Sequence, residues 1–322
     1  MKAAMTVGRL SGFWRSLLTG EAAIKAGYSF RERLWGMLIT VKPRFALMVT
    51  PVNAASAAVL AYGGYPSLTK CILGLLSVAF VSASTIVFND IVDRKRDVLC
   101  WPKRSLPSGR VRLMPALALA LILLAGSLVL TWLAFNPLAF FILLSVFALG
   151  ILYALYLRRK VGYLALPPIV GLIYLGGWAA FSPETLFSAR LPWLLYLLGV
   201  LWQAAHIMVY SPLHPLYTEQ GQLRTESKAL FAATSPRTAV ALGMGFLALT
   251  VLLSGLLPLF TGLSFVYLPL TIIAGGWSLV RTTRFLRQPT DKEVGFRAFS
   301  AVSTLRTVIS GAILLDVLFL WK

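Results

Sequence analysis

Acidic residues, cysteines and histidines are all scarce in this chain of 322 residues. Cys71 stands at one end of a predicted helix and Cys100 in the loop beyond its other end, so the two are too far apart for a disulfide bond. With only two histidines beside them, they form no zinc-binding pattern. Charged residues make up 13% of the chain, against about 25% in soluble domains, whereas hydrophobic residues make up 58%. The composition therefore argues against a disulfide scaffold, a zinc protein and a water-soluble domain.

Long apolar segments dominate the sequence, and several approach the roughly 20 residues that a helix needs to cross a bilayer. The pattern predicts nine spans, at residues 46–62, 71–90, 115–134, 138–157, 163–181, 192–210, 238–257, 265–280 and 299–320. Pro51 and Pro269 make the first and the eighth the least regular. Because no long polar insert separates one group of spans from another, we expect an all-α integral membrane protein whose spans form a single bundle within residues 41–322.

Basic residues outnumber acidic ones by 30 to 11, which gives a net charge of +19. On the nine-span scheme they gather in the N-terminal segment and in the loops of one side, whereas the other side has only Lys70, Arg190 and Lys322. This asymmetry predicts that the N-terminus and the basic loops lie on the cytoplasmic side of a bacterial or archaeal membrane, or of its organellar equivalent. The charge thus follows the membrane topology, and we expect no nucleic-acid partner.

The first 40 residues differ from a secretory signal, because no apolar core of suitable length follows Met1. Apolar residues recur there at helical spacing beside Arg9 and Arg15, namely Leu10, Phe13, Trp14, Leu17 and Leu18. Residues 1–40 are therefore predicted to be a separate N-terminal segment, with an amphipathic helix that lies in the membrane interface.

One acidic stretch stands where the second span meets a basic loop, and its polar residues are spaced as on a helix. Asn89, Asp93 and Asp97 are four residues apart and Asp90 precedes Asp93 by three, so all four share one stripe if the helix continues. Carboxylates packed in this way repel one another unless a cation lies among them. Mg²⁺ takes oxygen ligands and bridges to phosphate groups. We therefore predict that Asp90, Asp93 and Asp97 bind Mg²⁺ and, with Asn89, act on a diphosphate at the membrane surface.

Cationic residues that enter the same end of the bundle are candidates for contacts with that diphosphate. They are Lys42 before the first span, Lys103 and Arg104 after the aspartates, and Arg158 and Lys160 after the fourth span. The positive-inside rule explains such residues as well, so both explanations stay open at this point.

The chain resembles the UbiA-type membrane prenyltransferase superfamily from Lys42 onward. The resemblance rests on the number and orientation of the spans, on an NDxxDxxxD motif that begins at Asn89, and on a KRxLPSG segment from Lys103 to Gly109. It implies a bundle of nine spans around a central cavity, in which two aspartate-rich motifs hold Mg²⁺ and an isoprenyl diphosphate. It also implies transfer of the prenyl group to a lipophilic acceptor, such as an aromatic one.

The second aspartate-rich motif of that family is altered here. The stretch that follows the sixth span, from Tyr210 to Lys228, has no aspartate at all. Either Glu219 takes over as a metal ligand, or cations such as Arg224 and Lys228 replace one metal ion, or the chain is no longer a conventional transferase.

Three functions therefore remain open from the sequence. The first is a Mg²⁺-dependent prenyltransferase that joins an isoprenyl diphosphate to a lipophilic acceptor. The second is a membrane terpene cyclase, in which the prenyl chain itself is the nucleophile, and the third is a binding protein that has lost turnover. The first two need a hydrophobic cavity with aromatic walls, because such walls exclude water and stabilise an allylic cation.

Overall fold

The computed structural model describes residues 27–213, 235–264 and 266–320, and every regular element in these ranges is a helix. This confirms the predicted all-α class. The longer helices are α2 (Phe30–Thr40), α3 (Thr50–Tyr62), α4 (Leu68–Cys100), α5 (Leu113–Ala134), α6 (Pro137–Leu152), α8 (Leu166–Ala179), α9 (Leu191–Tyr210), α10 (Pro236–Leu256), α12 (Tyr267–Arg287) and α13 (Lys292–Leu320). Short segments connect or extend them, namely the π-helical η1 (Arg44–Val49) and η2 (Tyr153–Leu157), the 3₁₀ turns η3 (Tyr163–Ala165), η4 (Pro183–Thr185) and η5 (Ser211–Leu213), and the short helices α7 (Arg158–Lys160) and α11 (Pro258–Thr261). The amphipathic helix predicted around Leu10 to Leu18 lies outside the described residues.

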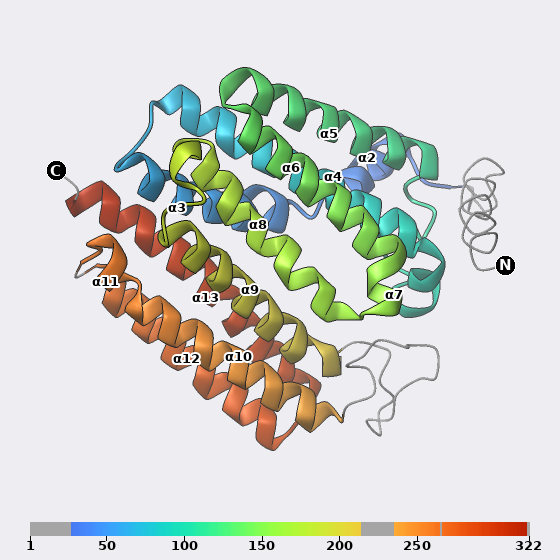
Figure 1. The fold of residues 1–322 in the computed structure, drawn as a ribbon. Coiled ribbons are helices and arrows are strands. Elements are labelled where there is room, and N and C mark those ends of the chain that lie inside the picture. The colour runs from blue at the N-terminus through green and yellow to red at the C-terminus, as the bar shows by residue number, and fades with distance from the viewer. Residues whose placement is uncertain (1–26, 214–234, 265, 321–322) are drawn as a thin grey trace, which may run out of the picture.

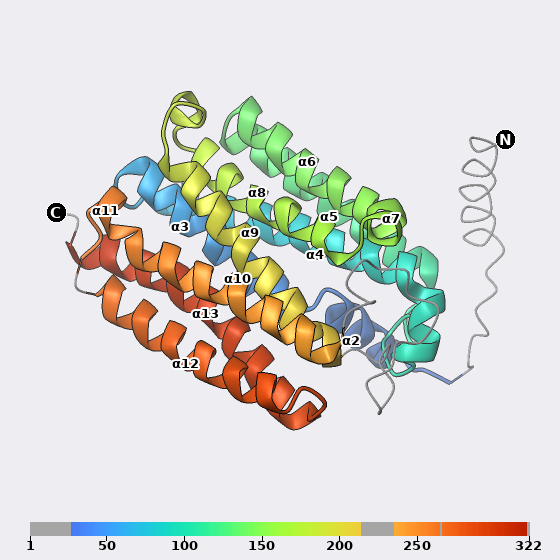
Figure 2. The same cartoon turned by 60° about the horizontal axis from the view of Figure 1, so that its bottom comes forward.

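The helices lie side by side in one bundle with their long axes roughly aligned (Figures 1 and 2). In the first group α4 packs along α5 and α6. In the second group α9 packs along α8, α10 and α13, and α12 packs along α13. Helix α3 contacts both groups, α4 on one side and α8 and α13 on the other, so it joins them. Helices α2 and α7 mark one end of the bundle and α11 marks the other (Figures 1 and 2).

Seven helical segments in the described ranges are long and apolar enough to cross a membrane. They are Arg44–Tyr62, Leu68–Val98, Leu113–Ala134, Pro137–Leu157, Leu191–Leu213, Pro236–Thr261 and Lys292–Phe319. The other two expected spans fall short of this measure, because Tyr163–Ala179 is a shorter apolar helix and α12 carries three arginines in its last two turns. Both still pack within the bundle, α8 against α9 and α12 against α13.

Helix α4 is longer than the sequence predicted. We expected the second span to end at residue 90 and a loop to cover 91–114, but α4 continues to Cys100 and the chain turns only between Trp101 and Arg112. The expected loop was wrong because the charges of residues 90–97 were taken as a sign of solvent. In the structure, Lys42, Arg104 and Arg158 from neighbouring segments pair with the aspartates of this stretch, so the helix continues without exposing them.

Neither of the two prolines that weakened the sequence pattern breaks its helix. Pro51 is the second residue of α3, directly after η1, and Pro269 is the third residue of α12. Pro269 fits the first turn of α12 because the N–H that proline lacks has no intrahelical partner there. Pro51 lies inside the continuous helical segment Arg44–Tyr62, where the π-helical η1 precedes it.

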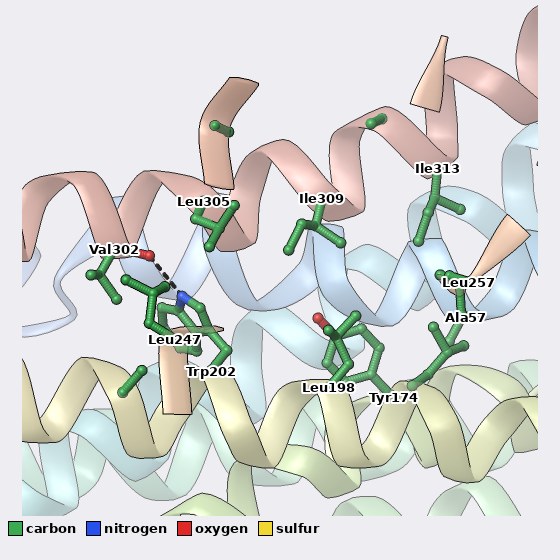
Figure 3. Close-up of a cluster of buried hydrophobic side chains, with 14 of the residues drawn as sticks. Ala57, Tyr174, Leu198, Trp202, Leu247, Leu257, Val302, Leu305, Ile309 and Ile313 are labelled. Atoms are coloured by element: carbon green, nitrogen blue, oxygen red, sulfur yellow. Dashed lines mark hydrogen bonds between the residues drawn. The ribbon is translucent and has the colours of Figure 1, made fainter. Parts of the chain in front are cut away.

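Close contacts fix α3 against the second group. The side-chain oxygen of Asn53 accepts hydrogen bonds from the hydroxyl of Tyr174, at 3.2 Å, and from the hydroxyl of Ser310, at 2.7 Å. Gly177 faces the backbone of α3 so closely that a Cβ atom there would lie 2.2 Å from the carbonyl oxygen of Ala54. The largest buried apolar cluster fills the space between α3, α8, α9 and α13 (Figure 3). These contacts hold α3 closely against the second group.

Candidate active site

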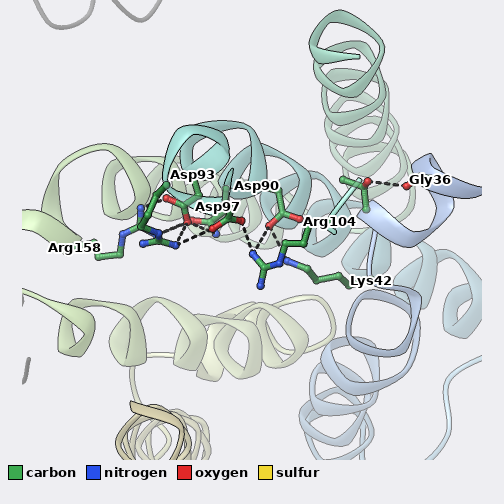
Figure 4. A network of polar contacts seen from close by, with 10 residues as sticks. Gly36, Lys42, Asp90, Asp93, Asp97, Arg104 and Arg158 are labelled. Carbon is green, nitrogen blue, oxygen red and sulfur yellow. Dashed lines mark hydrogen bonds and ion pairs between the residues drawn. The ribbon is translucent and has the colours of Figure 1, made fainter. Parts of the chain in front are cut away.

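The polar residues of the NDxxDxxxD motif lie along the last turns of α4, at the end of the bundle that also holds α2 and α7. Asp90, Asp93 and Asp97 are all buried, with 7%, 4% and 1% of their surfaces exposed. Because α4 is continuous, the three carboxylates point the same way from one stripe, as the spacing predicted (Figure 4). Three buried negative charges in one place require cations close by.

Asp90 is paired with a residue that stands before the first span. The Nζ atom of Lys42 lies 2.8 Å from Asp90 Oδ1. Lys42 has a φ of 50°, in the left-handed region that non-glycine residues rarely adopt, and it precedes Pro43 and the π-helical η1. Such backbone strain persists only where surrounding contacts hold it. The pairing with Asp90 is one such contact.

Asp93 is paired with a residue that follows the fourth span. Arg158 meets its carboxylate with both terminal nitrogens, Nη1 at 2.7 Å from Oδ2 and Nη2 on Oδ1. Arg96 also donates to Oδ2, at 2.8 Å, and the Asn89 amide donates to it at 3.3 Å. Burial alone lowers the pKa of the Arg158 guanidinium, but the hydrogen bond to Asp93 and its charge outweigh this and raise that pKa above its ordinary value. The guanidinium therefore stays charged.

Asp97 is paired with Arg104, a residue of the turn that follows α4. Arg104 Nη1 lies 2.5 Å from Asp97 Oδ2 and 4.0 Å from Asp90 Oδ1, and its guanidinium lies over the Trp101 ring at 5.1 Å (Figure 4). Gly109, with a φ of 75°, lets the KRxLPSG segment turn back toward α5. The other oxygen of Asp97, Oδ1, is buried and has no hydrogen-bond partner, although Arg96 Nη2 is 3.6 Å away.

Two π-helical segments deliver the long-range partners. Segment η1 begins two residues after Lys42, and η2 ends directly before Arg158. A π-turn holds more residues than an α-turn, so it shifts the direction of the side chains that follow or precede it, and such segments are frequent at functional sites. Here each π-helical segment stands next to a cation, Lys42 or Arg158, whose side chain points toward α4.

The donor set of this cluster suits Mg²⁺. Carboxylate oxygens are the ligands that this ion prefers, and the buried, unpartnered Asp97 Oδ1 is an oxygen that a cation could contact. Within the described ranges, no three acidic, histidine or cysteine side chains converge closely enough to hold a metal ion. Mg²⁺ is commonly bound through one or two carboxylates, with waters and substrate phosphates completing its shell. The residues present therefore fit an ion that arrives with a phosphate ligand.

The sequence predicted most of this cluster, but not all of it. The structure brings Lys42, Arg104 and Arg158 to the aspartates. Lys103 and Lys160 are exposed, and neither forms an ion pair with a described residue. The other predicted site residues, Glu219, Arg224 and Lys228, lie outside the described residues.

Arg96 is the residue of this cluster that the sequence analysis missed. It was read as part of a charged loop, yet it contacts both Asp93 and Asp97. The signal was present in the sequence, because an aspartate and an arginine three residues apart are neighbours on a helix.

The sequence profile of the UbiA prenyltransferase family matches residues 48–303 of the chain. The chain belongs to the UbiA prenyltransferase family. This confirms the resemblance seen in the motif residues, and with it the predicted class of enzyme, a membrane prenyltransferase. The apolar helices described above fit the multi-pass membrane fold of this family.

Relatives of this UbiA-family chain are named as enzymes that act on different acceptors. A protoheme IX farnesyltransferase of Salinispora tropica is 28% identical over 313 residues, 93% of this chain and 94% of the relative. A 4-hydroxybenzoate octaprenyltransferase of Alkalilimnicola ehrlichii is 30% identical over 267 residues, 80% of this chain and 85% of the relative. The solved structure of a UbiA homolog from Archaeoglobus fulgidus bound to GPP and Mg²⁺ has the same fold, with a TM-score of 0.58 at 18% identity, over 87% of this chain and 99% of that one.

Proposed function

We propose that this chain transfers an isoprenyl group from its diphosphate to a lipophilic acceptor, and to an aromatic one in particular, in a reaction that depends on Mg²⁺. The observation that carries the proposal is the cluster of three buried aspartates and four paired cations at one end of an apolar bundle. The names of the relatives and the GPP and Mg²⁺ of the archaeal homolog support it.

One or two of the carboxylates of Asp90, Asp93 and Asp97 would hold the metal ion, with Asn89 beside them as a hydrogen-bonding residue. When bound, the ion would neutralise negative charge on the departing diphosphate. Asp97 is the strongest candidate ligand, because one of its oxygens lacks any hydrogen-bond partner. Glu219 stays a prediction from the sequence as a further ligand.

Cations of the cluster would bind and orient the diphosphate. Lys42, Arg96, Arg104 and Arg158 place four positive charges against three carboxylates, so the cluster attracts anions even before a metal ion is counted. Preorganised cations of this kind stabilise a leaving anion without further reorganisation. Lys103 and Lys160 are exposed and available for the outer phosphate oxygens, and Arg224 and Lys228 stay predictions for the same role.

Aromatic rings contact the cluster or stand next to it in the sequence of α4. Tyr153 is buried beneath Arg158, with its ring 5.9 Å from the guanidinium carbon, and Phe88 and Phe147 meet edge to face at 6.2 Å. Such rings exclude water and stabilise an allylic cation through their π faces. A second feature suits the prenyl chain, an apolar cavity of about 260 Å³ between α3, α4, α6 and α8. Its lining reaches Val78 on α4, about 18 Å from Asp90 by helical rise, so only a chain of several isoprene units would extend into it.

The membrane arrangement that goes with this function has nine spans. These are the seven long apolar segments and, in addition, α8 and α12. The N-terminus and the aspartate cluster would then face the cytoplasm, and residues 1–40 would lie in the interface, as the distribution of basic residues predicts. Exposed Phe30, Leu34 and Trp35 on α2 support an interfacial position for the part of this segment that the structure describes.

Labelled geranylgeranyl diphosphate, incubated with the purified chain and Mg²⁺, tests the proposal when candidate acceptors are added one at a time. We expect prenylated product and diphosphate release only with an acceptor, with protoheme and 4-hydroxybenzoate as the first two to test. Chelation with EDTA should abolish release and added Mg²⁺ should restore it.

Each other outcome contradicts the proposal in a different way. A hydrocarbon product that forms without any acceptor would indicate the terpene cyclase instead. No release of diphosphate under any condition would indicate a binding protein. Release that is unaffected by EDTA would remove the metal from the proposal.

A further inference from the structure

A second buried cation lies in the other helix group, away from the aspartates. Arg306, in the middle of α13, has only 4% of its surface exposed. Two of its guanidinium nitrogens, Nε and Nη2, are buried and have no hydrogen-bond partner. A buried cation with unpaired donors is unfavourable unless an anion completes it.

Two aromatic rings enclose this guanidinium. Its central carbon lies 4.5 Å from the Trp202 ring and 5.7 Å from the Tyr174 ring. Both rings are held from behind, Trp202 by a 2.7 Å hydrogen bond to the Val302 carbonyl oxygen (Figure 3) and Tyr174 by its bond to Asn53. The π faces stabilise the positive charge, but they accept nothing from Nε and Nη2. The guanidinium is therefore held in place while Nε and Nη2 remain available as hydrogen-bond donors.

A line of aromatic rings leads from Arg306 toward the aspartate end of the bundle. Ring contacts run from Trp202 to His206 at 4.7 Å, from His206 to Phe299 at 4.6 Å, and from Phe299 to Tyr210 at 4.9 Å. The residues alternate between two facing stripes, which are Trp202, His206 and Tyr210 on α9 and Phe299, Ser303 and Arg306 on α13.

Exposure along this line falls toward Arg306. Tyr210, His206 and Phe299 are partly exposed, whereas Trp202 and Arg306 are buried. Tyr210 lies close enough to Asp97 and Arg104 to interact with their charges. From Tyr210 to Trp202 the helical rise is about 12 Å. The line of rings thus begins near the proposed diphosphate site and ends at the guanidinium of Arg306, two of whose nitrogens lack a partner.

We infer that Arg306 binds a carboxylate of the acceptor and so determines which acceptors the enzyme takes, an inference that rests on the proposed prenyltransferase function. A guanidinium matches a carboxylate with two parallel hydrogen bonds, and Nε and Nη2 are the pair of donors that this geometry uses. The line of rings that leads from the proposed diphosphate site toward Arg306 spans about 12 Å along α9, between Tyr210 and Trp202. The rings between the two sites suit a flat, aromatic acceptor that carries the acid group at its far end.

Binding without donor or metal tests this directly. Purified protein in detergent is titrated by calorimetry with two pairs of probes, 4-hydroxybenzoic acid with its methyl ester and protohaem IX with its dimethyl ester. We expect the wild type to bind at least one acid about 10-fold more tightly than the corresponding ester. In Arg306→Met this preference disappears while ester binding is unchanged, and Arg306→Lys retains part of it. Arg297→Met is the matched control, because Arg297 is an exposed arginine on the same helix.

Two results would overturn the inference. One is that the wild type binds neither acid more tightly than its ester, which needs no variant and so no assumption about folding. The other is that Arg306→Met keeps the preference. Failure of the proposed function itself is seen separately, as a wild type that releases no diphosphate with any acceptor. In the working enzyme, Arg306→Met should raise the KM for the acid acceptor and leave the KM for the prenyl diphosphate unchanged.

Discussion

Two arginines of this chain, the partly buried Arg158 and the buried Arg306, show two ways of keeping a positive charge inside a membrane bundle. Arg158 meets the Asp93 carboxylate with both terminal nitrogens, and so its charge is balanced by the protein itself. Arg306 is still less exposed, yet its guanidinium lies against the rings of Trp202 and Tyr174, and two of its nitrogens, Nε and Nη2, have no hydrogen-bond partner. The difference indicates that the first charge belongs to a preformed network, and the second awaits an anion from outside the protein.

Among the variants that test this comparison, we expect Asp93→Asn, in the aspartate cluster, to have the largest effect. The change keeps the size of the side chain but removes the charge that two arginines share. We expect diphosphate release to fall about 100-fold or more, since groups that stabilise developing charge commonly have effects of this size. The measurement is release of labelled diphosphate at saturating Mg²⁺ and acceptor.

Asp316→Asn is the control for that variant. Asp316 is also fully buried, but it lies on the other helix group and accepts hydrogen bonds from the backbone and the hydroxyl of Ser264, at 2.6 and 3.0 Å. Its loss should lower thermal stability and leave the turnover of the folded fraction within a few-fold of the wild type. Equal losses of turnover in both variants would mean that Asp93 has only a structural role.

The comparison can also be tested through stability alone, with Arg158→Met and Arg306→Met. Arg158→Met removes two charged hydrogen bonds from the buried Asp93 carboxylate and leaves it with Arg96 as its remaining cation, so this variant should destabilise the protein by about 3 kcal/mol. Arg306→Met removes a cation two of whose three nitrogens already lack partners, so it should be neutral or stabilising. Unfolding in mixed detergent micelles measures both. A loss in Arg306→Met as large as that in Arg158→Met would show that the protein already compensates this charge.

The sequence was sufficient for the stripe of aspartates, because a helical period relates residues that are close in the chain. It was insufficient for their partners. Lys42 reaches Asp90 across 48 residues and Arg158 reaches Asp93 across 65, and such pairs depend on how the helices pack and on the offsets of η1 and η2. Positive-inside charge was an equally good explanation of both cations until the packing was known.

Arg306 had a signal in the sequence that was overlooked. It is an ionisable residue in the middle of the predicted span 299–320, and such residues within a membrane helix point to function by default. What the sequence could not supply is its surroundings, since Tyr174 and Trp202 come from two other helices. The length of α4 was misjudged for a related reason. Charge was read as solvent exposure, whereas these charges are buried in pairs.

The smallest expected effect concerns the close contact between Gly177 on α8 and the backbone of α3. The variant Gly177→Ala tests it. The added methyl group would lie 2.2 Å from the Ala54 carbonyl oxygen, so α8 must move away from α3, at a cost of about 1–3 kcal/mol. Gly245→Ala is the control, because nothing lies within 4 Å of its Cβ position in α10 and the change should stabilise the protein by up to about 1 kcal/mol.

The Gly177→Ala variant also affects the Arg306 site, because Tyr174 is on α8 and lies against Arg306. Gly177→Ala should therefore weaken the preference for acid over ester acceptors a few-fold. Diphosphate release, which depends on α4, should stay close to that of the wild type. An equal loss in both measurements would show that the aspartate cluster and the Arg306 site are not independent regions but respond to helix packing as one.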